Sequence, residues 1–408
     1  MSEWKKVKLG ELYEVHNGLS KGRQFFGTGF PFLTFSDVFN NWFLPEQLES
    51  LVQTTDKERE ACSIKAGDVF ITRTSETMDE LGMSSVALKD YPNATYNGFT
   101  KRLRPITDRV NPRYIGYYLR TSKFRGQFMA FSTMTTRASL ANNDLLNMEV
   151  ELPPMEIQLR IATILSRYDS LIENYQKQIK LLEEAAQRLY KEWFVDLHFP
   201  GHKNTKIVDG VPKGWEKKKV REIGKVITGK TPSTSKKEYY GGQIPFITIP
   251  DMHTGIYPTS SQFLSDLGAN SQSGKFIPAN SLMVSCIGTA GLVCITKEEC
   301  QTNQQINSLV LNDNSLLYYM YNTFLSLKEH LNNIGSNGAT MTNVNKSKFE
   351  SIEILIPNNS ISNLYNKAVE QSFRGIKTLS SQICLLTEAR DRLLPKLMSG
   401  DIKIESLK

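Results

Sequence analysis

The longest regular pattern of apolar positions in the chain follows Leu152-Pro-Pro. From Ile157 to Trp193, apolar or aromatic residues recur at alternating steps of four and three, with one extra step of four between Tyr175 and Ile179. This spacing is a heptad seam with a single stutter. It predicts a helix of about 40 residues, on the order of 60 Å long, which is too long to be buried against one domain core. The seam positions are Ile157, Ile161, Ile164, Tyr168, Leu171, Tyr175, Ile179, Leu182, Ala186, Leu189 and Trp193.

A second stripe of the same kind lies near the end of the sequence. We expect Asn359 or Ser360 to cap this helix, and we expect it to stop at Pro395, because proline has no N–H for the helical ladder. A stripe this narrow favours packing of the two helices on each other. The alternative is two separate helices, each lying on its own domain. The stripe consists of Tyr365, Val369, Phe373, Ile376, Leu379, Ile383, Leu386 and Leu393.

The rest of the chain has the character of strands and turns, and it is duplicated. FPFLTFSD at 30–37 returns as IPFITIPD at 244–251, with Pro, Phe, Thr and Asp in the same places. Small drifts in the offset between the copies indicate loop-length changes within one shared fold, so two copies of about two hundred residues account for the chain. The other matched segments are 4–18 with 215–229, 63–72 with 276–285 and 148–153 with 352–357, and helix-like patches are expected near 114–125 and 316–331.

Together these patterns predict an α+β protein with an internal two-fold repeat: two tandem globular domains linked by two long antiparallel helices that form a coiled coil. The antiparallel sense follows from topology, because each helix has to lead the chain to or away from a domain at the opposite end. The predicted boundaries are 1–152 for the first domain, 153–198 for the central helix, 199–212 for a linker, 213–356 for the second domain and 357–408 for the C-terminal helix and tail.

Composition places the chain among globular proteins. Its 408 residues exceed one ordinary core, and 40% hydrophobic with 22% charged residues is a globular balance. A net charge of +7 fits a polyanionic partner and equally fits a mildly basic cytoplasmic protein. The five cysteines show no C-x-x-C spacing, so we expect reduced thiols rather than a disulfide or zinc framework. We expect neither a signal peptide nor a membrane span, since no segment is apolar and long enough.

Two literal motif matches suggest cofactor chemistry. Residues 224–231, GKVITGKT, fit the Walker A pattern, but a P-loop needs a helix that opens at the Lys-Thr, and Pro232 breaks a helix there. Residues 25–29, FFGTG, resemble the F-x-G-x-G of amino-methyltransferases, and NPRY at 111–114 comes near their N-P-P-Y. A turn between two strands explains the glycines more simply. We therefore expect no catalytic residues and no nucleotide site, and the scattered histidines give no metal spacing.

Basic, aromatic and amide residues in the expected loops form a candidate DNA-binding set. Cationic side chains hold phosphates, while Arg, Asn and Gln can read base edges. A solvated surface charge explains any single member equally well, so the hypothesis rests on the set, and the segment KRLR at 101–104 is read as another cationic loop. The candidates are Lys21, Arg23, Arg73 and Arg137 in the first domain and Lys230, Lys236, Lys237, Tyr239, Gln304 and Lys346 in the second.

The two copies agree in their expected strands and differ in these loops. Two related scaffolds with different loops would read two different short sequences on one duplex, while the helix pair fixes their separation. This arrangement predicts an asymmetric bipartite DNA site.

Four further motifs are specific in combination. They are Thr231-Pro-Ser with Gly242-Gln-Ile-Pro-Phe leading to Asp251, then LPPMEIQLRIA from Leu152, KEWFVDLHFPG from Lys191 and RDRLLPKLMSG from Arg390. With them the sequence resembles, over its full length, the specificity subunits of type I restriction-modification systems. The first copy departs from the pattern at Leu19-Ser20-Lys21, where Thr-Pro would be expected.

The resemblance implies two target-recognition domains, each reading one half of a bipartite site, in a chain without an active site of its own. It implies methyltransferase (M) subunits bound through the helical regions and restriction/translocase (R) subunits joined to that core in the cytoplasm. S-adenosylmethionine, ATP and Mg²⁺ would belong to those partners, which carry out restriction and adenine methylation. A duplicated coiled-coil scaffold that binds only proteins is the alternative, and a steep loss of DNA binding with salt would exclude it. The candidate docking residues are Arg160, Arg167, Gln176 and Arg390.

Overall fold

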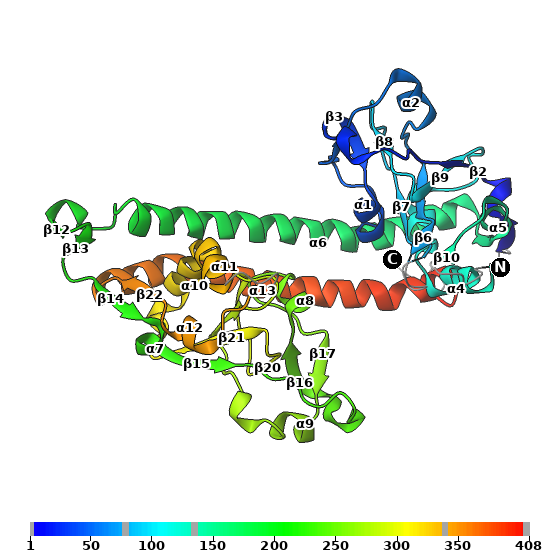
Figure 1. Cartoon of the computed structure of the whole chain (residues 1–408). Helices are drawn as coiled ribbons and strands as arrows, with labels where there is room; N and C mark the ends of the chain where they lie inside the picture. The colour runs from blue at the N-terminus through cyan, green and yellow to red at the C-terminus, as the bar shows by residue number, and fades with distance from the viewer. Residues whose placement is uncertain (1–3, 76–80, 132–137, 337–341, 403–408) are drawn as a thin grey trace. The chain divides into compact units, whose positions relative to one another are not determined.

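The computed structural model describes residues 4–75, 81–131, 138–336 and 342–402 (Figure 1). It divides into two compact units: unit 1 comprises Met1–Leu171 and Thr387–Lys408, and unit 2 comprises Ile172–Leu386. Two long helices, α6 (Met155–Tyr190) and α13 (Asn359–Met398), run through both units. Each unit therefore contains one copy of the repeat and a stretch of both helices.

Unit 1 holds the first copy. Its strands are β1 (Lys5–Lys8), β2 (Tyr13–Asn17), β3 (Phe26–Leu33), β4 (Leu51–Val52), β5 (Val69–Thr72), β6 (Thr74–Ser75), β7 (Ser84–Val86), β8 (Thr95–Tyr96), β9 (Thr100–Pro105), β10 (Ala138–Ser139) and β11 (Glu149–Leu152). Its helices and helical turns are η1 (Leu9–Glu11), η2 (Arg23–Phe25), α1 (Phe35–Asn40), α2 (Asp56–Ala61), α3 (Pro112–Tyr118), α4 (Ser122–Phe131) and α5 (Asn142–Asn147). One sheet has the order β2-β9-β5-β7 and another the order β4-β3-β8, while β1 pairs with β11 and β6 with β10.

Unit 2 holds the second copy. Its strands are β12 (Ile207–Val208), β13 (Val211–Pro212), β14 (Glu216–Lys219), β15 (Gly224–Thr228), β16 (Tyr240–Ile247), β17 (Gln262–Leu264), β18 (Leu282–Ser285), β19 (Val293–Ile295), β20 (Gln301–Thr302), β21 (Ile306–Leu311) and β22 (Glu353–Ile356). Its helices and helical turns are η4 (Lys191–Val195), η5 (His202–Asn204), α7 (Val220–Ile223), η6 (Lys237–Tyr239), α8 (Ile249–Met252), α9 (Asp266–Asn270), η7 (Ser273–Lys275), η8 (Asn314–Leu316), α10 (Leu317–Ser326), α11 (Lys328–Gly335) and α12 (Lys346–Glu350).

Three sheets of unit 2 repeat three of unit 1 strand for strand, whereas the pairs β6 with β10 and β12 with β13 each occur in one unit. The repeated orders in unit 2 are β15-β21-β18-β19 and β17-β16-β20, and β14 pairs with β22 as β1 pairs with β11. The register also repeats, because Val15 lies opposite Leu103 and Val226 lies opposite Leu309. The predicted duplication and the predicted helix patches, now α3 with α4 and α10 with α11, are confirmed.

The repeated Thr and Asp of the duplicated motif close the same helix cap in each copy. Thr34 precedes α1, and its N–H and hydroxyl both donate to the Asp37 carboxylate, at 2.9 and 2.7 Å. Thr248 precedes α8 and does the same to Asp251, at 2.8 Å for each bond. Because these side chains satisfy the exposed donors of the first turn, each copy ends this strand, whose last two residues are buried, with a fixed entry into a helix.

Within unit 2, α6 and α13 pack along an apolar seam. The Tyr365 hydroxyl donates to the Ala186 carbonyl at 3.2 Å, and Gly375 lies against Leu182. As residue numbers rise along α13, the numbers of the contacting residues on α6 fall, so the two helices are antiparallel. Buried Val369, Phe373 and Ile376 of α13 share the core of unit 2 with Ala186 of α6.

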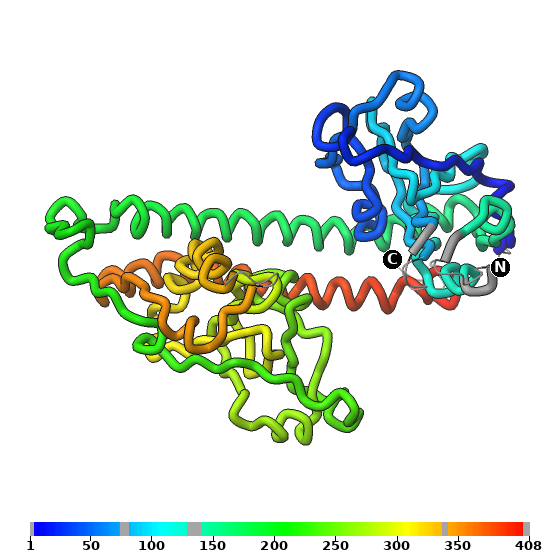
Figure 2. The backbone as a smooth tube through the Cα atoms, viewed as in Figure 1, coloured from blue at the N-terminus to red at the C-terminus, as the bar shows by residue number. Residues whose placement is uncertain are grey.

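Within unit 1 the same two helices pair again. Ile161 and Leu165 of α6 share a core with Leu394 and Leu397 of α13. Further along, the Arg390 guanidinium lies 2.7 Å from the Asp169 carboxylate, so the order of contacts is again antiparallel. Figure 2 shows the chain running in opposite directions along the two helices. The predicted antiparallel pair is confirmed.

Both ends of α13 differ from the prediction. The cap is Asn358, whose Oδ1 accepts the Ile361 N–H at 3.0 Å, and Asn359 and Ser360 already belong to the helix. The stop at Pro395 is wrong, because α13 runs through it to Met398. A proline so near the end removes only one N–H from the ladder, and burial of Leu397 favours the last turn.

Among the described residues, no helix combines the length and apolar character that crossing a bilayer requires.

Candidate nucleic-acid interface

In each unit two loops lie side by side next to the sheets. One follows the first strand of the larger sheet and the other follows β8 or β20. We call each pair the loop platform: residues 18–21 with 97–99 in unit 1, and 229–231 with 303–305 in unit 2. The Leu19 N–H donates to the Tyr96 carbonyl at 2.9 Å, and the Lys230 N–H donates to the Thr302 carbonyl at 2.9 Å.

A matched glycine permits this close approach in both copies. A Cβ added at Gly18 would lie 2.1 Å from the Asn97 carbonyl oxygen, and one added at Gly229 would lie 2.1 Å from the Asn303 carbonyl oxygen. Both distances are far inside van der Waals contact with backbone, so neither position accepts a side chain without moving the loop. The glycines that align in the sequence thus have the same structural cause.

A buried asparagine then turns the second loop of each platform. Asn97 Oδ1 accepts the Phe99 N–H at 2.8 Å, and Asn303 Oδ1 accepts the Gln305 N–H at 3.1 Å. Such side-chain turns replace a backbone turn and fix the following residue. The two platforms therefore share a backbone and present different side chains.

The platform of unit 2 is polar and cationic. Lys230 and Gln304 are exposed, and the Thr231 hydroxyl donates to Gln304 Oε1 at 2.7 Å, which orients the amide. Close by, the Tyr240 hydroxyl donates to the Pro232 carbonyl at 2.8 Å and joins the Lys236–Tyr239 segment to this loop.

That neighbouring segment carries three of the candidates. The Lys236 ammonium lies 4.9 Å from the centre of the Tyr239 ring and donates to its hydroxyl at 3.0 Å, and this contact raises the pKa of Lys236. Lys237 is exposed beside them. The structure thus brings Lys230, Gln304 and this segment to one side of the domain.

Of the DNA-binding candidates in unit 1, Lys21 is less available to a phosphate than the lysines of unit 2. Lys21 forms an ion pair of 2.6 Å with Glu58, and its side chain is only 15% exposed. The hydrogen bond from Lys21 is the main cause that lowers the pKa of Glu58 to about 2. Arg23 is exposed, and the Arg73 N–H donates to the Phe99 carbonyl at 3.0 Å, which places Arg73 at the platform.

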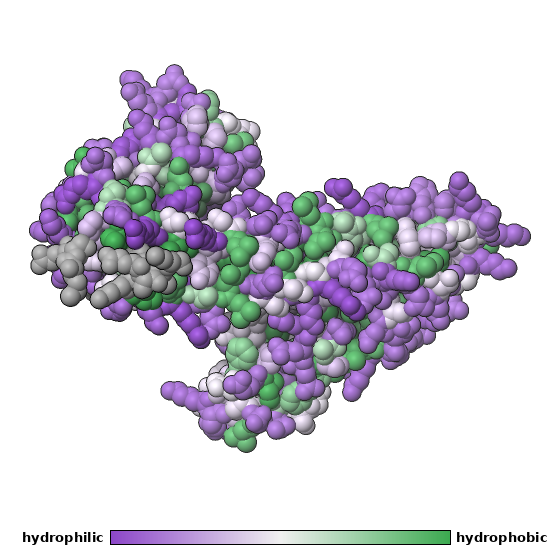
Figure 3. Space-filling view, turned by 180° about the vertical axis from the view of Figure 1, so that it is seen from behind, coloured by the Kyte–Doolittle hydropathy of each residue, from purple (hydrophilic) through white to green (hydrophobic). Residues whose placement is uncertain are grey.

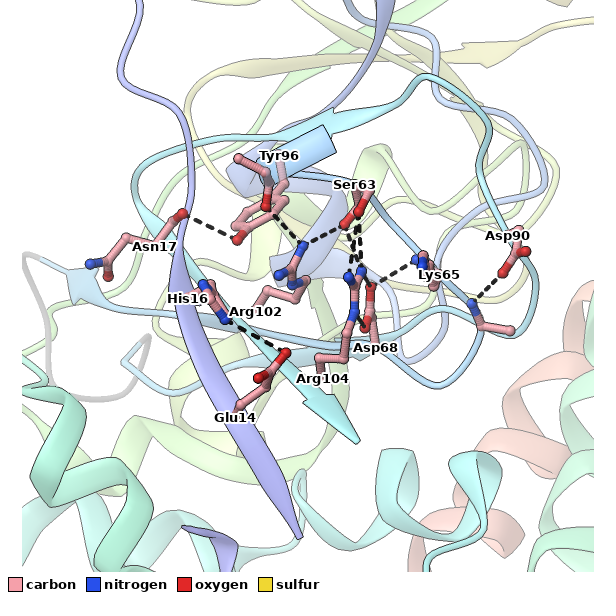
Figure 4. A network of polar contacts seen from close by, with 12 residues as sticks. Glu14, His16, Asn17, Ser63, Lys65, Asp68, Asp90, Tyr96, Arg102 and Arg104 are labelled. Atoms are coloured by element: carbon pink, nitrogen blue, oxygen red, sulfur yellow. Dashed lines mark hydrogen bonds and ion pairs between the residues drawn. The ribbon is translucent and has the colours of Figure 1, made fainter. Parts of the chain in front are cut away.

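The cationic segment 101–104 is not a loop, so that prediction is wrong. It belongs to β9, where Arg104 donates to both oxygens of buried Asp68 at 2.8 and 2.7 Å. Arg102 donates to the Ser63 carbonyl at 2.7 Å, and Figure 4 shows both guanidinium groups directed at Ser63. These arginines therefore hold the turn before β5 and are not available to phosphates.

The remaining candidates lie elsewhere. Lys346 opens α12 and is exposed, with Glu350 at 3.5 Å. Arg137 lies outside the described residues. The DNA roles of all these residues stay predictions.

Three of the four docking candidates face outward as expected. Arg160, Arg167 and Gln176 are exposed on α6, and Arg160 pairs with Glu156 at 2.7 Å. The outward placement of Arg390 is wrong, because its side chain is 12% exposed between Asp169 and the Trp42 ring. Docking itself stays a prediction for all four.

The two cofactor-like motifs have structural roles. Residues 224–228 of the Walker-like match form β15, which pairs with β21 and therefore has no phosphate-binding loop geometry. The glycines at 27 and 29 lie within β3. Asn111 caps α3 by accepting the Arg113 and Tyr114 N–H groups, each at 3.0 Å.

The thiols of Cys286 and Cys294 in unit 2 are buried. Burial raises the pKa of Cys286 to about 11 and that of Cys294 to about 12, so both stay protonated near neutral pH.

Sequence reasoning missed Gly18, Asn97 and Phe99 as parts of one platform. The signal was present in the duplication, since Asn97 occupies the place of Asn303 once β9 is aligned with β21.

Comparisons with known proteins agree with this arrangement. A family model described as the type I restriction modification DNA specificity domain matches residues 1–184 and 212–384. The HindI specificity subunit of Haemophilus influenzae is 31% identical over 98% of this chain and 100% of that protein. The MjaIX specificity subunit of Methanocaldococcus jannaschii is 28% identical over 99% of this chain and 95% of that protein.

Among solved structures, the type I restriction-modification S subunit from M. genitalium shares the fold. Its TM-score is 0.59 at 12% identity, with 97% of this chain and 96% of that chain covered.

Proposed function

The chain belongs to the family of type I restriction-modification DNA specificity proteins, and on that premise we propose how it divides the reading of DNA between its domains. It is a specificity subunit that recognises DNA sequence with two tandem domains. In our proposal each loop platform contacts one half of a split, asymmetric site. A scaffold that binds only proteins gains no support from the family.

The observation that carries this proposal is the pair of platforms with one backbone and two chemistries. The same glycine and the same asparagine turn fix both loops, so the contact geometry is repeated. The side chains differ, with exposed Lys230 and Gln304 in one platform and exposed Phe99 beside half-buried Leu19 in the other. Equal geometry with unequal side chains favours two half-sites of unequal sequence.

The helix pair would then set the gap between the half-sites. Both α6 and α13 run through both units, and α6 alone is about 54 Å long at 1.5 Å per residue. That length corresponds to about one and a half turns of B-DNA. Because the helices pair with each other in each unit, a change in their length should change the gap and leave the half-sites unaltered.

Catalysis is proposed to reside in partners. This chain would contribute no catalytic group and no cofactor site of its own. M subunits that use S-adenosylmethionine would methylate adenine, and R subunits that use ATP and Mg²⁺ would translocate and cut. Exposed Arg160, Arg167 and Gln176 on α6 are the proposed docking positions for the M subunits, and the assembly is proposed to act in the cytoplasm.

Mapping of methylated adenines tests the proposal. The chain should be co-expressed with its M subunit in a host without adenine methylation, and methylated positions read across the genome. We expect a split, non-palindromic motif. Replacing residues 1–152 by the matching domain of a relative should alter one half of it, whereas a change in both halves would contradict the assignment of one domain to one half-site.

A further inference from the structure

Phe99 stands out on the platform of unit 1. It is 57% exposed, compared with 42% for Phe26 and 39% for Phe263. Single exposed apolar side chains are ordinary on protein surfaces, and Figure 3 shows such residues scattered among hydrophilic ones. Exposure alone therefore assigns nothing, and the case rests on how this residue is held and on what surrounds it.

The backbone of Phe99 is fixed on both sides. Its N–H donates to the Asn97 side chain at 2.8 Å, and its carbonyl accepts the Arg73 N–H at 3.0 Å. The preceding Gly98 packs so closely that an added Cβ would lie 2.6 Å from the Ser20 hydroxyl. A loop this constrained fixes the point at which the side chain leaves the backbone, which lowers the backbone entropy lost when the ring binds a partner.

One cation is held at this turn. The Arg73 N–H donates to the Phe99 carbonyl at 3.0 Å, so Arg73 belongs to the platform. Lys101, two residues after Phe99, is 4% exposed and donates to Asn142, so its charge is not available to a phosphate. An aromatic side chain beside a cation fits nucleic acid, because phosphates meet the charge while bases meet the ring.

In the second domain the equivalent turn has a polar side chain. There Gln305 occupies the place of Phe99, and its N–H is held by Asn303. Its side-chain oxygen accepts the Asn303 amide at 3.1 Å, and neighbouring Gln304 is oriented by Thr231. The position thus presents amides in one copy and a bare phenyl ring in the other.

We propose that Phe99 is a base-stacking wedge that contacts the bases of the half-site read by unit 1. This inference rests on the proposed function and extends it, since it states that the two domains use different chemistry at one shared turn. An inserted apolar side chain partly unstacks a base step, and flexible pyrimidine–purine steps yield most readily. Unit 1 would therefore read deformability at this point, where unit 2 reads hydrogen-bonding groups.

The test uses the M–S complex and a duplex with the motif mapped above. Adenines of the unit 1 half-site are replaced one at a time by 2-aminopurine, whose fluorescence rises when it loses stacking. The variants are Phe99→Ala, Phe99→Trp and Ile106→Ala. The last is a matched control, because Ile106 is 58% exposed in the same domain and lies after β9.

We expect wild type to raise the fluorescence at one step of that half-site. Phe99→Ala should abolish this rise and weaken binding about tenfold, because a base–aromatic contact is lost. The dependence of affinity on salt should not change, since no phosphate contact is removed. Phe99→Trp should bind within about threefold of wild type, and Ile106→Ala should match wild type in both measurements.

Any brightening at the methylated adenine itself, where the partner acts, should be equal in wild type and Phe99→Ala. If Phe99→Ala binds as tightly as wild type, or keeps the fluorescence rise, the wedge is refuted while bipartite reading stands. If Ile106→Ala weakens binding equally, the effect is not specific to the ring and the wedge is also refuted. Failure of the proposed function would appear earlier, as a wild-type methylome without a split motif, and would overturn both.

Discussion

The two recognition domains share a frame and differ in what fills it. In each domain a turn with one residue in the left-handed backbone conformation precedes a core strand. That residue is Gly67 before β5 and Asn280 before β18. Yet the buried ion pair between Arg104 and Asp68 has no counterpart in unit 2, where the matching residues are Val310 and Ser281.

The difference teaches which residues define the frame. Caps, left-handed turns and the platform glycines recur because the backbone requires them. The charged pair does not recur, although Asp68 is fully buried, so the same frame folds with or without it. Unit 2 keeps only a fragment of the arrangement, since the Ser281 hydroxyl donates to the Pro278 carbonyl at 2.8 Å.

The largest expected effect comes from breaking that pair on one side. Asp68→Ala leaves the Arg104 guanidinium partly buried and without its carboxylate, which should destabilise unit 1 by about 3–5 kcal/mol. Urea unfolding of the full chain measures the loss. Hydrogen exchange of peptides from β5 and β9, compared with β18 and β21, should place it in unit 1.

A double variant tests whether unit 2 is a valid template for unit 1. Asp68→Ser with Arg104→Val installs the pair of residues that unit 2 carries, and it should recover more than half of the stability lost in Asp68→Ala. Replacing a buried ion pair by groups of matched packing is often nearly neutral, whereas removing one partner is not. A double variant no more stable than Asp68→Ala would show that the two interiors are not interchangeable.

The second largest expected effect is a difference in stability loss when each of the two capping carboxylates, Asp37 and Asp251, is removed. Among the described residues the Asp37 carboxylate accepts hydrogen bonds only within its cap, so Asp37→Ala should cost about 1 kcal/mol. Asp251 is 3% exposed and also accepts the Ser261 N–H at 2.9 Å, so Asp251→Ala should cost about 2–3 kcal/mol.

Denaturation of both single variants, with hydrogen exchange in α1 and α8, provides the measurement. Equal losses would mean that the extra bond to Ser261 contributes nothing to stability.

Much of this frame was predictable, because its causes are local or repeated. The heptad steps predicted the helix pair, and the recurrence of Thr and Asp marked equivalent strand ends. Arg390 was predicted to face outward, although the heptad spacing itself places it on the seam. It stands four residues after Leu386 and three before Leu393, which is a seam position, and the seam accepts a cation there because Asp169 pairs with it.

The prediction of a loop at 101–104 was wrong for a different reason. Three cations in four residues read as a solvated loop, but Arg102 and Arg104 lie on one face of β9, where Ser63 and Asp68 satisfy them. Those partners are more than thirty residues away in sequence. Local charge could not predict that pairing. Comparison with the apolar strand INSLVL at 306–311 would have indicated a strand.

DNA binding should separate the two platforms by charge. Lys230 is exposed and forms no ion pair within the described part of the chain, so Lys230→Ala should lower the slope of log affinity against log salt by about 1. Lys21→Ala should lower it by less than half as much, because Glu58 already neutralises this cation.

Titration of the M–S complex on its mapped duplex at several salt concentrations gives these slopes. Lys203→Ala, at an exposed lysine of η5, is the control and should leave the slope unchanged. Equal changes for Lys21 and Lys230 would mean that the Glu58 pair opens on DNA.

The smallest expected effect concerns the stability that the Lys21–Glu58 pair itself contributes, and it should depend on pH. The pKa of Glu58 is lowered from its ordinary value of 4.5 to about 2, so the folded protein favours the carboxylate. The resulting stabilisation is complete above about pH 4.5 and is lost as pH falls toward about 2, because only the unfolded chain gains a proton in that window. The difference in unfolding free energy between wild type and Glu58→Gln should thus stay constant from about pH 5 to pH 8 and shrink below about pH 5. For a pair near the surface we expect this difference to be about 1 kcal/mol or less. A difference that grows as pH falls would show that Glu58 is not the acceptor of the Lys21 charge.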